Sequence, residues 1–293
     1  MRRRVRVCDH APAAEVVLGD ARRVLPSVPP ESARSCVTSP PYWGLRDYGQ
    51  DGQIGAERSL DEYVEKLVRV FREVRRCLTR DGTLWLVVGD GYTSGGRTWR
   101  DSDRKNPARR MSYRPPTPRG MKPKDLLGVP WLLAFALRAD GWYLRSDVIW
   151  HKPNCQPESV RDRPTRSHEY VFLMSKSGDY HYDAEAVSER ASGGGARNRR
   201  TVWSIGTEAC PTDHPAAFPA ALVETCLAAG TEEGDLVLDP FCGSGTVGEV
   251  ALRMGRRFLG MELKRKYAEA ARRRMGLTVA HGPAKRRRLE GAR

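Results

Sequence analysis

The sequence predicts an α/β fold in which helices cover both faces of a mostly parallel, doubly wound sheet. Short β-prone runs alternate with helical patterns along the 293 residues. Several of these runs end in polar or glycine-rich loops, which is where such sheets place their functional groups. One run, residues 83–88, is nearly continuously apolar, as expected of a strand covered on both faces. The length suggests one large domain or two small ones, enough to bury a substantial core.

The individual elements follow in chain order. Two short strands open the pattern, and each runs into a polar loop. A long segment then repeats apolar residues at steps of three and four, which predicts a helix with one buried face. Asp81 and Gly82 predict a turn before the next strand. Strands are expected at residues 16–18, 35–38, 83–88, 144–150 and 169–174, and helices at residues 60–78 and 129–137.

The last part of the domain, residues 219–274, reads as helix, strand, glycine-rich loop, helix, strand and helix. This order is typical of a βαβ unit. Two arginine-rich and lysine-rich segments without a clear hydrophobic face interrupt the chain. We therefore expect one domain over residues 1–282 with basic inserts at residues 92–124 and 184–208, followed by a basic tail at residues 283–293.

The chain is strongly basic, with a formal net charge of +14 at pH 7 and a sequence pI near 9.7. Such an excess on a surface favours a polyanionic partner. Hydrophobic residues make up 40% of the chain and aromatic residues 8%, which are values of globular proteins. Composition therefore argues against a disordered, collagen-like or simple coiled-coil protein.

Seven cysteines without a CxxC pair argue against a disulfide framework and against a zinc module, so no metal is expected. The first residues carry positive charge, but Asp9 and His10 stand where a signal peptide needs an apolar stretch. The longest near-apolar run, residues 129–137, is less than half of a membrane span. These observations predict a soluble, cytoplasmic protein that does not enter a membrane.

A first candidate site follows the predicted strand at residues 237–239. Asp239 ends that strand, and the glycine-rich residues 241–246 lead into a helix. Small residues let a ligand approach the backbone, and a helix start offers free N–H groups. No lysine follows Gly245, which disfavours a phosphate loop. Glu262 ends the next strand, where its two oxygens could accept the hydroxyls of a ribose.

A second candidate site is the loop at residues 38–43, Thr-Ser-Pro-Pro-Tyr-Trp. Pro40 and Pro41 restrict the backbone and remove two N–H donors, so that carbonyl acceptors can point outward. Tyr42 and Trp43 offer flat faces for stacking. The loop is therefore predicted to hold a planar amine.

Together the two loops resemble the hallmarks of the S-adenosylmethionine-dependent DNA methyltransferases that act on exocyclic amino groups. Residues 241–245 match the FxGxG-type loop, and residues 39–42 match the (S/D/N)PPY tetrapeptide. The tetrapeptide comes first in the chain, as in the permuted group called the β class. The similarity extends through residues 19–21, 145–153, 168–172 and 214–219. It implies a circularly permuted, Rossmann-like methyltransferase fold.

The resemblance also implies roles for single residues. In the loop at residues 38–43, the catalytic site would be formed by Ser39, Pro40, Pro41 and Tyr42, with Ser39 and the Pro40 carbonyl accepting from the amine. Glu262 would hold the ribose of S-adenosylmethionine, and Asp20 would accept from its adenine amino group. The methionine part would lie among Asp239, Phe241, Gly243, Ser244, Gly245 and Thr246, and a further cofactor wall would include His214 and Phe218.

Serine before Pro-Pro-Tyr resembles the N4-cytosine subgroup, whereas aspartate is commoner in the N6-adenine subgroup. N6-adenine methylation stays open as the alternative, followed by an RNA or protein-amide methyltransferase and by a silent DNA-binding module. Transfer to a ring carbon would need a nucleophilic cysteine after proline, and neither Cys155 nor Cys210 has that setting.

Double-stranded DNA is the expected partner, because lysine and arginine that neutralise phosphates release counterions. The target base would have to flip out of the helix to reach such a pocket. The resemblance leaves a homodimer and a cognate restriction endonuclease open as further partners. The expected DNA contacts are Trp43, Arg104, Lys105, Arg109, Arg110, Arg197, Arg199 and Arg200.

Overall fold

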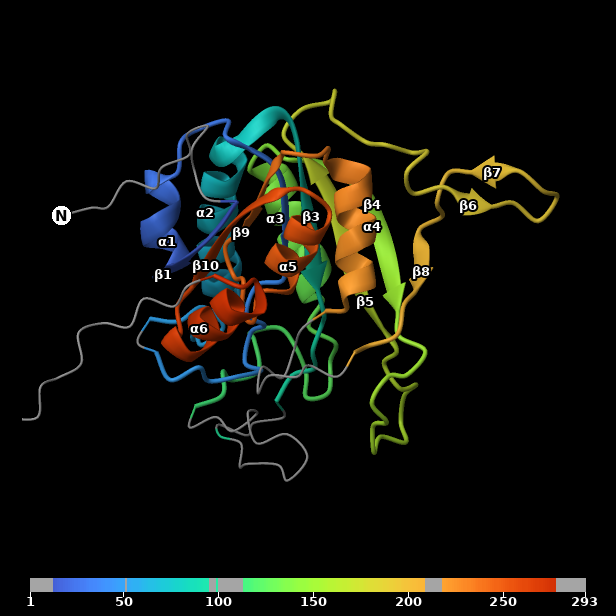
Figure 1. Ribbon diagram of the computed structural model, residues 1–293. Coiled ribbons are helices and arrows are strands. Elements are labelled where there is room, and N and C mark those ends of the chain that lie inside the picture. Colours follow the sequence, from blue (N-terminus) through green and yellow to red (C-terminus); the bar gives the residue numbers. More distant parts are fainter. Residues whose placement is uncertain (1–12, 51, 95–98, 100–112, 209–217, 278–293) are drawn as a thin grey trace, which may run out of the picture.

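In the part of the chain that the structure describes, eight strands form a central sheet in the order β1-β10-β9-β2-β3-β5-β4-β8 (Figure 1). The structure is a computed structural model that describes residues 13–50, 52–94, 99, 113–208 and 218–277. The strands are β1 (Ala14–Leu18), β2 (Ala33–Thr38), β3 (Leu78–Val88), β4 (Tyr143–His151), β5 (His168–Ser175), β8 (Val202–Ser204), β9 (Leu236–Asp239) and β10 (Arg257–Glu262).

The sheet is mostly parallel, as predicted. Each neighbouring pair runs parallel except the two pairs that involve β5, which lies antiparallel between β3 and β4. Because of this reversal, the first residues of β5 lie at the edge of the sheet where the other strands end. Tyr170 of β5, for example, pairs with Val88 at the end of β3.

Helices cover both faces of the sheet. One hydrophobic cluster joins the sheet to α1 (Ala21–Val24), α2 (Leu60–Cys77) and α3 (Val129–Ala139), and a second joins it to α4 (Ala220–Gly230), α5 (Thr246–Arg253) and α6 (Arg265–Arg274). A short 3-10 helix, Leu25–Ser27, follows α1. In β3, Leu84 and Leu86 face the first cluster while Trp85 and Val87 face the second. This alternation explains the apolar run in the sequence, because both faces of the strand are buried.

The long helix α2 begins and ends as its sequence dictates. The Ser59 hydroxyl accepts from the Glu62 backbone N–H at 3.2 Å and so caps the first turn. Its buried residues recur at helical spacing from Leu60 to Cys77. The chain then enters β3 directly at Leu78. The turn predicted at Asp81 and Gly82 is instead an irregularity inside β3, where its pairing with β2 shifts register.

Strands from the two ends of the chain meet in the middle of the sheet. β9 and β10 come from the C-terminal part, yet β9 pairs with β2 and β10 pairs with β1. All four run in the same direction, so that their carboxyl ends lie together at one end of the sheet. This arrangement agrees with the permuted order of the two candidate loops.

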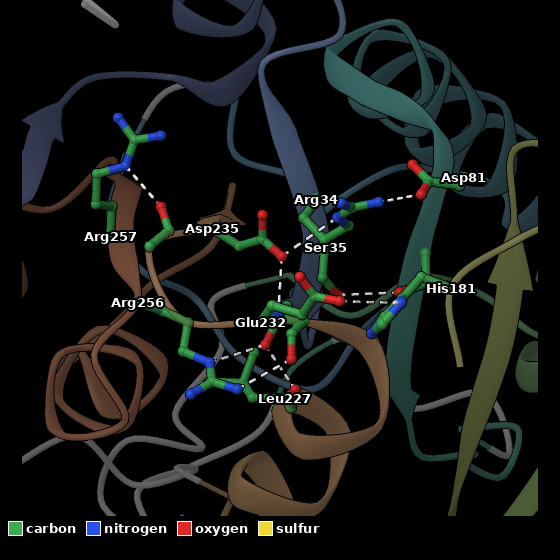
Figure 2. A network of polar contacts seen from close by, with 12 residues as sticks. Arg34, Ser35, Asp81, His181, Leu227, Glu232, Asp235, Arg256 and Arg257 are labelled. Carbon is green, nitrogen blue, oxygen red and sulfur yellow. Dashed lines mark hydrogen bonds and ion pairs between the residues drawn. The ribbon is translucent and has the colours of Figure 1, made fainter. Parts of the chain in front are cut away.

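At the opposite end of the sheet, where these parallel strands begin, a network of polar contacts joins them (Figure 2). The Arg34 guanidinium, at the start of β2, pairs with Asp81 of β3 and, at 3.2 Å, with Asp235 just before β9. The Arg257 backbone N–H, at the start of β10, donates to the Asp235 carbonyl at 2.8 Å. Four adjacent strands are thus tied together at the end that lies away from both loops.

Residues 184–208 are more ordered than the sequence predicts. They form a hairpin of β6 (Glu189–Arg190) and β7 (Ala196–Arg197), and then β8, which pairs in parallel with β4. Trp203 of β8 is buried, with its ring centroid 6.0 Å from that of Trp85. The prediction of an unpatterned insert was therefore wrong for residues 202–204, which belong to the main sheet.

Much of the first basic segment, namely residues 95–98 and 100–112, lies outside the described residues, as do the tail at residues 283–293 and the N-terminal residues 1–12. The two flanks of that segment lie side by side: Tyr92 bridges to Leu126, and the Thr93 N–H donates to the Asp125 carbonyl at 3.0 Å. None of the helices in the described ranges combines the length and the hydropathy that crossing a membrane requires.

Candidate active site

The two candidate loops begin from side chains that touch. Thr38 ends β2 and Asp239 ends β9, and these strands are parallel neighbours. The Thr38 hydroxyl donates to Asp239 Oδ1 at 2.6 Å. Since one loop follows Thr38 and the other follows Asp239, both start at the same place on the edge of the sheet. The structure therefore brings the starts of the two loops together.

Asp239 lies at the base of this site with a relative exposure of 2%. Its Oδ1 accepts from Thr38 and also from the Phe241 backbone N–H at 3.0 Å. Burial raises the pKa of Asp239 to about 7, against the lowering effect of these two hydrogen bonds, and the nearby Glu262 carboxylate adds to the rise. The site therefore holds an acid that titrates near neutral pH.

This pKa predicts a pH dependence of stability in the ligand-free protein. The folded state binds a proton at Asp239 between pH 4 and pH 7 that the unfolded chain, with its usual pKa of about 3.9, releases. The free energy of unfolding should therefore fall as pH rises through this window, by an amount on the order of a few kcal/mol. Thermal unfolding of wild type and Asp239→Asn from pH 4 to pH 8 measures the effect. The variant should lose less stability than wild type across this window; equal losses would contradict the raised pKa.

The glycine turn after β9 requires its glycines. Gly243 and Gly245 have φ values of 51° and 85°, in the left-handed region that residues with a side chain rarely adopt. A Cβ on Gly245 would also lie 2.9 Å from the Ala271 Cβ of α6. Thr246 then begins α5. The turn can therefore pass close to α6.

Glu262, at the end of β10, is joined to that turn. Its Oε2 accepts from the Gly243 backbone N–H at 3.0 Å, and its Oε1 accepts from the Lys264 backbone N–H at 2.7 Å. Burial raises the pKa of Glu262, although these backbone donors oppose the rise. Each carboxylate oxygen can accept more than one hydrogen bond, so both remain able to accept from a ligand's hydroxyl groups.

Asp20 follows β1, the next strand along the edge, and caps α1. Its carboxylate accepts from the Arg22 backbone N–H at 2.9 Å and pairs with the Arg22 guanidinium at 2.5 Å. Burial raises the pKa of Asp20, but the hydrogen bonds and charge of Arg22 outweigh it and the pKa is lowered. Arg22 also reaches the Gly52 carbonyl at 2.7 Å. The side chain expected to bind an adenine amino group is thus already engaged by a cation.

The Ser-Pro-Pro-Tyr loop is stabilised by hydrogen bonds of its own residues. The Ser39 hydroxyl donates to the Tyr42 hydroxyl at 3.3 Å, and the Tyr42 hydroxyl donates to Glu169 Oε2 at 2.8 Å. The Pro41 carbonyl accepts from the Tyr63 hydroxyl of α2 at 2.9 Å. This carbonyl is therefore already paired with the hydroxyl of a core tyrosine. Ser39 is the first residue of the loop after Thr38.

Trp43 does not offer a face for stacking. It belongs to the core, with a relative exposure of 9%, and its indole N–H donates to the Glu57 carbonyl at 3.0 Å. A large aromatic ring gains more from burial when its one polar atom finds an acceptor, and Glu57 provides it. The prediction that Trp43 contacts DNA was therefore wrong for this structure.

The remaining predicted residues divide into two groups. Phe218 is partly buried against the cluster under α4, and Arg199 lies over the Trp203 ring at 5.2 Å. Arg197 and Arg200 both pair with Glu189, at 2.9 Å and 2.6 Å. His214, Arg104, Lys105, Arg109 and Arg110 lie outside the described residues.

Sequence reasoning assigned no role to two residues that the structure brings to the site, Lys152 and Glu169. The Lys152 ammonium donates to Glu169 Oε1 at 2.6 Å, and Glu169 also accepts from Tyr42. Both lie in stretches that carry the resemblance. The missing signal was the reversed direction of β5, which places its first residues beside the carboxyl ends of the parallel strands.

The acceptors at the carboxyl ends of these strands fit a nucleoside ligand that carries hydroxyl groups. Glu262 can accept from hydroxyls, and glycines in the left-handed region let a ligand approach the backbone. Among the described residues, no group of three or more His, Cys, Asp or Glu side chains is arranged to hold a metal ion.

The fold and the two adjoining loops are those of an α/β protein of the methyltransferase class. The chain belongs to the N6/N4 family of DNA methyltransferases, since residues 33–273 match the family model described as DNA methylase. This membership confirms the resemblance noted in the sequence and the Rossmann-like fold that it implied.

Individual relatives agree with this assignment. The chain is 58% identical over 265 residues to the type II methyltransferase M.SmaI of Serratia marcescens, covering 90% of this chain and 91% of that protein. It is 57% identical over 253 residues to the type II methyltransferase M.Cfr9I of Citrobacter freundii, covering 86% of this chain and 84% of that protein.

Two solved structures share the fold. The PvuII DNA methyltransferase, described as cytosine-N4-specific, superposes with a TM-score of 0.68 at 22% identity, over 92% of this chain and 88% of that one. A putative DNA modification methylase from Thermus thermophilus, in complex with S-adenosyl-L-methionine, superposes with a TM-score of 0.62 at 28% identity, over 90% and 93%.

Proposed function

We propose that this chain transfers a methyl group from S-adenosylmethionine to the N4 amino group of cytosine within a specific sequence of duplex DNA. The observation that carries the proposal is the contact between Thr38 and Asp239, which brings the Ser-Pro-Pro-Tyr loop and the glycine turn to one site. A methyl donor held at the turn would then face an amine held at the loop.

The donor-binding half rests on the two carboxylates and the turn. Glu262 would accept from the ribose hydroxyls, and Asp239 and residues 241–246 would surround the methionine part. When bound, the sulfonium supplies an electrophilic methyl group and leaves as a neutral thioether, so that the leaving group needs no acid. The complex of the Thermus thermophilus relative with S-adenosyl-L-methionine supports this choice of donor.

The amine-binding half has to overcome the poor nucleophilicity of an aromatic amine, whose lone pair is delocalised into the ring. Hydrogen bonds from both N–H groups to well-placed acceptors favour the pyramidal form, in which the lone pair is exposed. Ser39 and the Pro40 carbonyl would be these acceptors. Fixed orientation of amine and methyl group would supply much of the acceleration.

Cytosine is favoured over adenine by the serine at the first position of the tetrapeptide, Ser39. The cytosine-N4-specific PvuII enzyme has the same fold, but at 22% identity it supports no more than the fold. In either case the base must flip out of the helix, because an enzyme cannot reach the amino group while the base is paired and stacked in the duplex.

Duplex DNA as the partner is supported by the net charge of +14 and by the type II methyltransferase relatives. Arg200 is well exposed on the segment that joins β7 to β8, beside Arg197 and Arg199. Phosphate contacts from such residues would make binding weaken steeply with salt. A restriction endonuclease that recognises the same sequence would be the natural companion of such an enzyme.

The test is methyl transfer from labelled S-adenosylmethionine to duplex DNA, RNA and protein in parallel, followed by mass spectrometry of the product nucleosides. We expect label in DNA alone and N4-methylcytosine as the product. N6-methyladenine would overturn the choice of base. Label in RNA or protein but not in DNA, or no transfer at all, would overturn the proposed function.

A further inference from the structure

A series of hydrogen-bonded side chains runs from the Ser-Pro-Pro-Tyr loop through β5 to the end of β4. It begins at Ser39, passes through the Tyr42 hydroxyl at 3.3 Å and reaches Glu169 Oε2 at 2.8 Å. The other oxygen of Glu169 accepts from Lys152 Nζ at 2.6 Å, and that ammonium also lies over the Trp150 ring, 4.2 Å from its centroid. The Lys152 and Glu169 side chains are 17% and 20% exposed, so water screens their ion pair little.

The carboxylate of Glu169 sets the donor-to-acceptor direction of these hydrogen bonds. A carboxylate only accepts hydrogen bonds, so the proton of the Tyr42 phenol must point to Glu169. Burial, and then the charge of Glu169, raise the pKa of Tyr42 well above its usual value, and the phenol keeps that proton. The phenol oxygen in turn accepts from Ser39.

The consequence for Ser39 follows directly. Its hydroxyl proton points to Tyr42, so both oxygen lone pairs are left for other donors. An amine that is to be activated donates N–H and needs such lone pairs. A serine turned the other way would present its own proton to the amine and compete with it.

The close packing around Tyr42 keeps this arrangement in place. A Cβ added to Gly89, at the end of β3, would lie 2.9 Å from Tyr42 Cε2 and 3.1 Å from Glu169 Cδ. The absence of a side chain at this position therefore allows the phenol and the carboxylate to meet.

We propose that Glu169, held by Lys152, is a positioning residue that sets the direction of the hydrogen bonds through Tyr42 and thereby makes Ser39 an acceptor for the target amine. The inference rests on the proposed function, since it concerns how the amine is held. Glu169 does not touch the amine; it acts through Tyr42 and Ser39.

Glu169→Gln tests this direction without changing the shape of the side chain. Lys152 can donate only to the amide oxygen, so the amide NH2 faces Tyr42 and donates to the phenol. The phenol proton then turns to Ser39, and Ser39 turns its own proton toward the amine. We expect kcat to fall about 10- to 100-fold, with the Kd for S-adenosylmethionine within about twofold of wild type. Glu73→Gln, which removes a carboxylate paired with Arg76 on α2, is the matched control and should keep wild-type kcat.

A second variant separates direction from a merely structural role. Tyr42→Phe keeps the ring but removes the hydroxyl that transmits the direction, and Ser39 is then free to rotate. In this background Glu169→Gln should have almost no further effect on kcat. Losses that multiply in the double variant would contradict the proposal, as would a Glu169→Gln variant with wild-type turnover.

Equilibrium binding provides a readout that does not depend on turnover. With S-adenosylhomocysteine present, we compare the Kd for duplex DNA carrying the target cytosine with the Kd for the same duplex carrying a pyrimidinone that lacks the amino group. The pyrimidinone pairs more weakly with guanine and flips out more easily, but this effect is common to both proteins. The ratio of the pyrimidinone Kd to the cytosine Kd should be several-fold lower in Glu169→Gln than in wild type, and an equal ratio would overturn the inference. A wild-type protein that methylates no DNA would instead refute the proposed function, so the two failures are distinguishable.

Discussion

Replacement of Ser39 by alanine should lower kcat for methyl transfer by about 100-fold or more, because under the proposed function it removes an acceptor for the amine whose charge develops in the transition state. The Kd for S-adenosylmethionine, measured by calorimetry, should stay within about twofold. Ser39 belongs to the amine-binding loop, and its hydroxyl contacts Tyr42 rather than the glycine turn. Turnover and donor affinity are therefore expected to separate.

Ser32→Ala is the matched control for this variant. Ser32 lies just before β2, whereas Ser39 lies just after it. The Ser32 hydroxyl donates to the Pro29 carbonyl at 2.8 Å, at the end of the strand away from the site. It should keep wild-type kcat. A Ser39→Ala variant that loses turnover and donor affinity to the same extent would show that the two halves of the site are not divided as assigned.

Replacement of Glu262 by glutamine should have the largest effect on donor binding. Glu262 accepts from two backbone N–H groups, of Gly243 and of Lys264. An amide has one acceptor oxygen, so one of these donors would face an NH2 group and the ribose would lose an acceptor. Each such loss inside a buried site costs about 1–3 kcal/mol, which corresponds to a Kd for S-adenosylmethionine raised by about 5- to 150-fold.

The readout for Glu262→Gln is the Kd of the donor, with thermal unfolding of the ligand-free protein as a check on folding. Glu224→Gln, on α4, removes a half-exposed carboxylate that pairs with Arg253 and is the control for the loss of charge. Unchanged donor affinity in Glu262→Gln would place the ribose elsewhere. The kcat at saturating donor should fall much less than in Ser39→Ala.

Most strands and helices could be predicted from the sequence, since their hydrophobic patterns are local. Residues 60–78 were predicted as a helix and α2 covers Leu60–Cys77; residues 144–150 were predicted as a strand and β4 covers Tyr143–His151. Partners in space are not local. Trp43 looked like a stacking residue because it follows Tyr42, but its ring packs into the core, where the Glu57 carbonyl accepts its N–H.

The same limit applies to the edges of the sheet and to charged side chains. The three residues of β8 carry too short a pattern to identify a strand, and they become one because β4 offers an unpaired edge. The Asp20 carboxylate, expected to accept from an adenine amino group, also pairs with Arg22, and residue type alone does not specify that side-chain geometry.

The class of fold, the two loops and their order follow from local sequence, because a strand, a glycine turn and a Pro-Pro pair depend on neighbours in the chain. Two contacts arise from tertiary packing: Thr38 donates to Asp239, and Tyr42 donates to Glu169. The first contact needs β2 and β9 to pair across the permuted chain, and the second needs β5 to run against its neighbours. Both depend on how distant segments bury their apolar faces together, which no local pattern specifies.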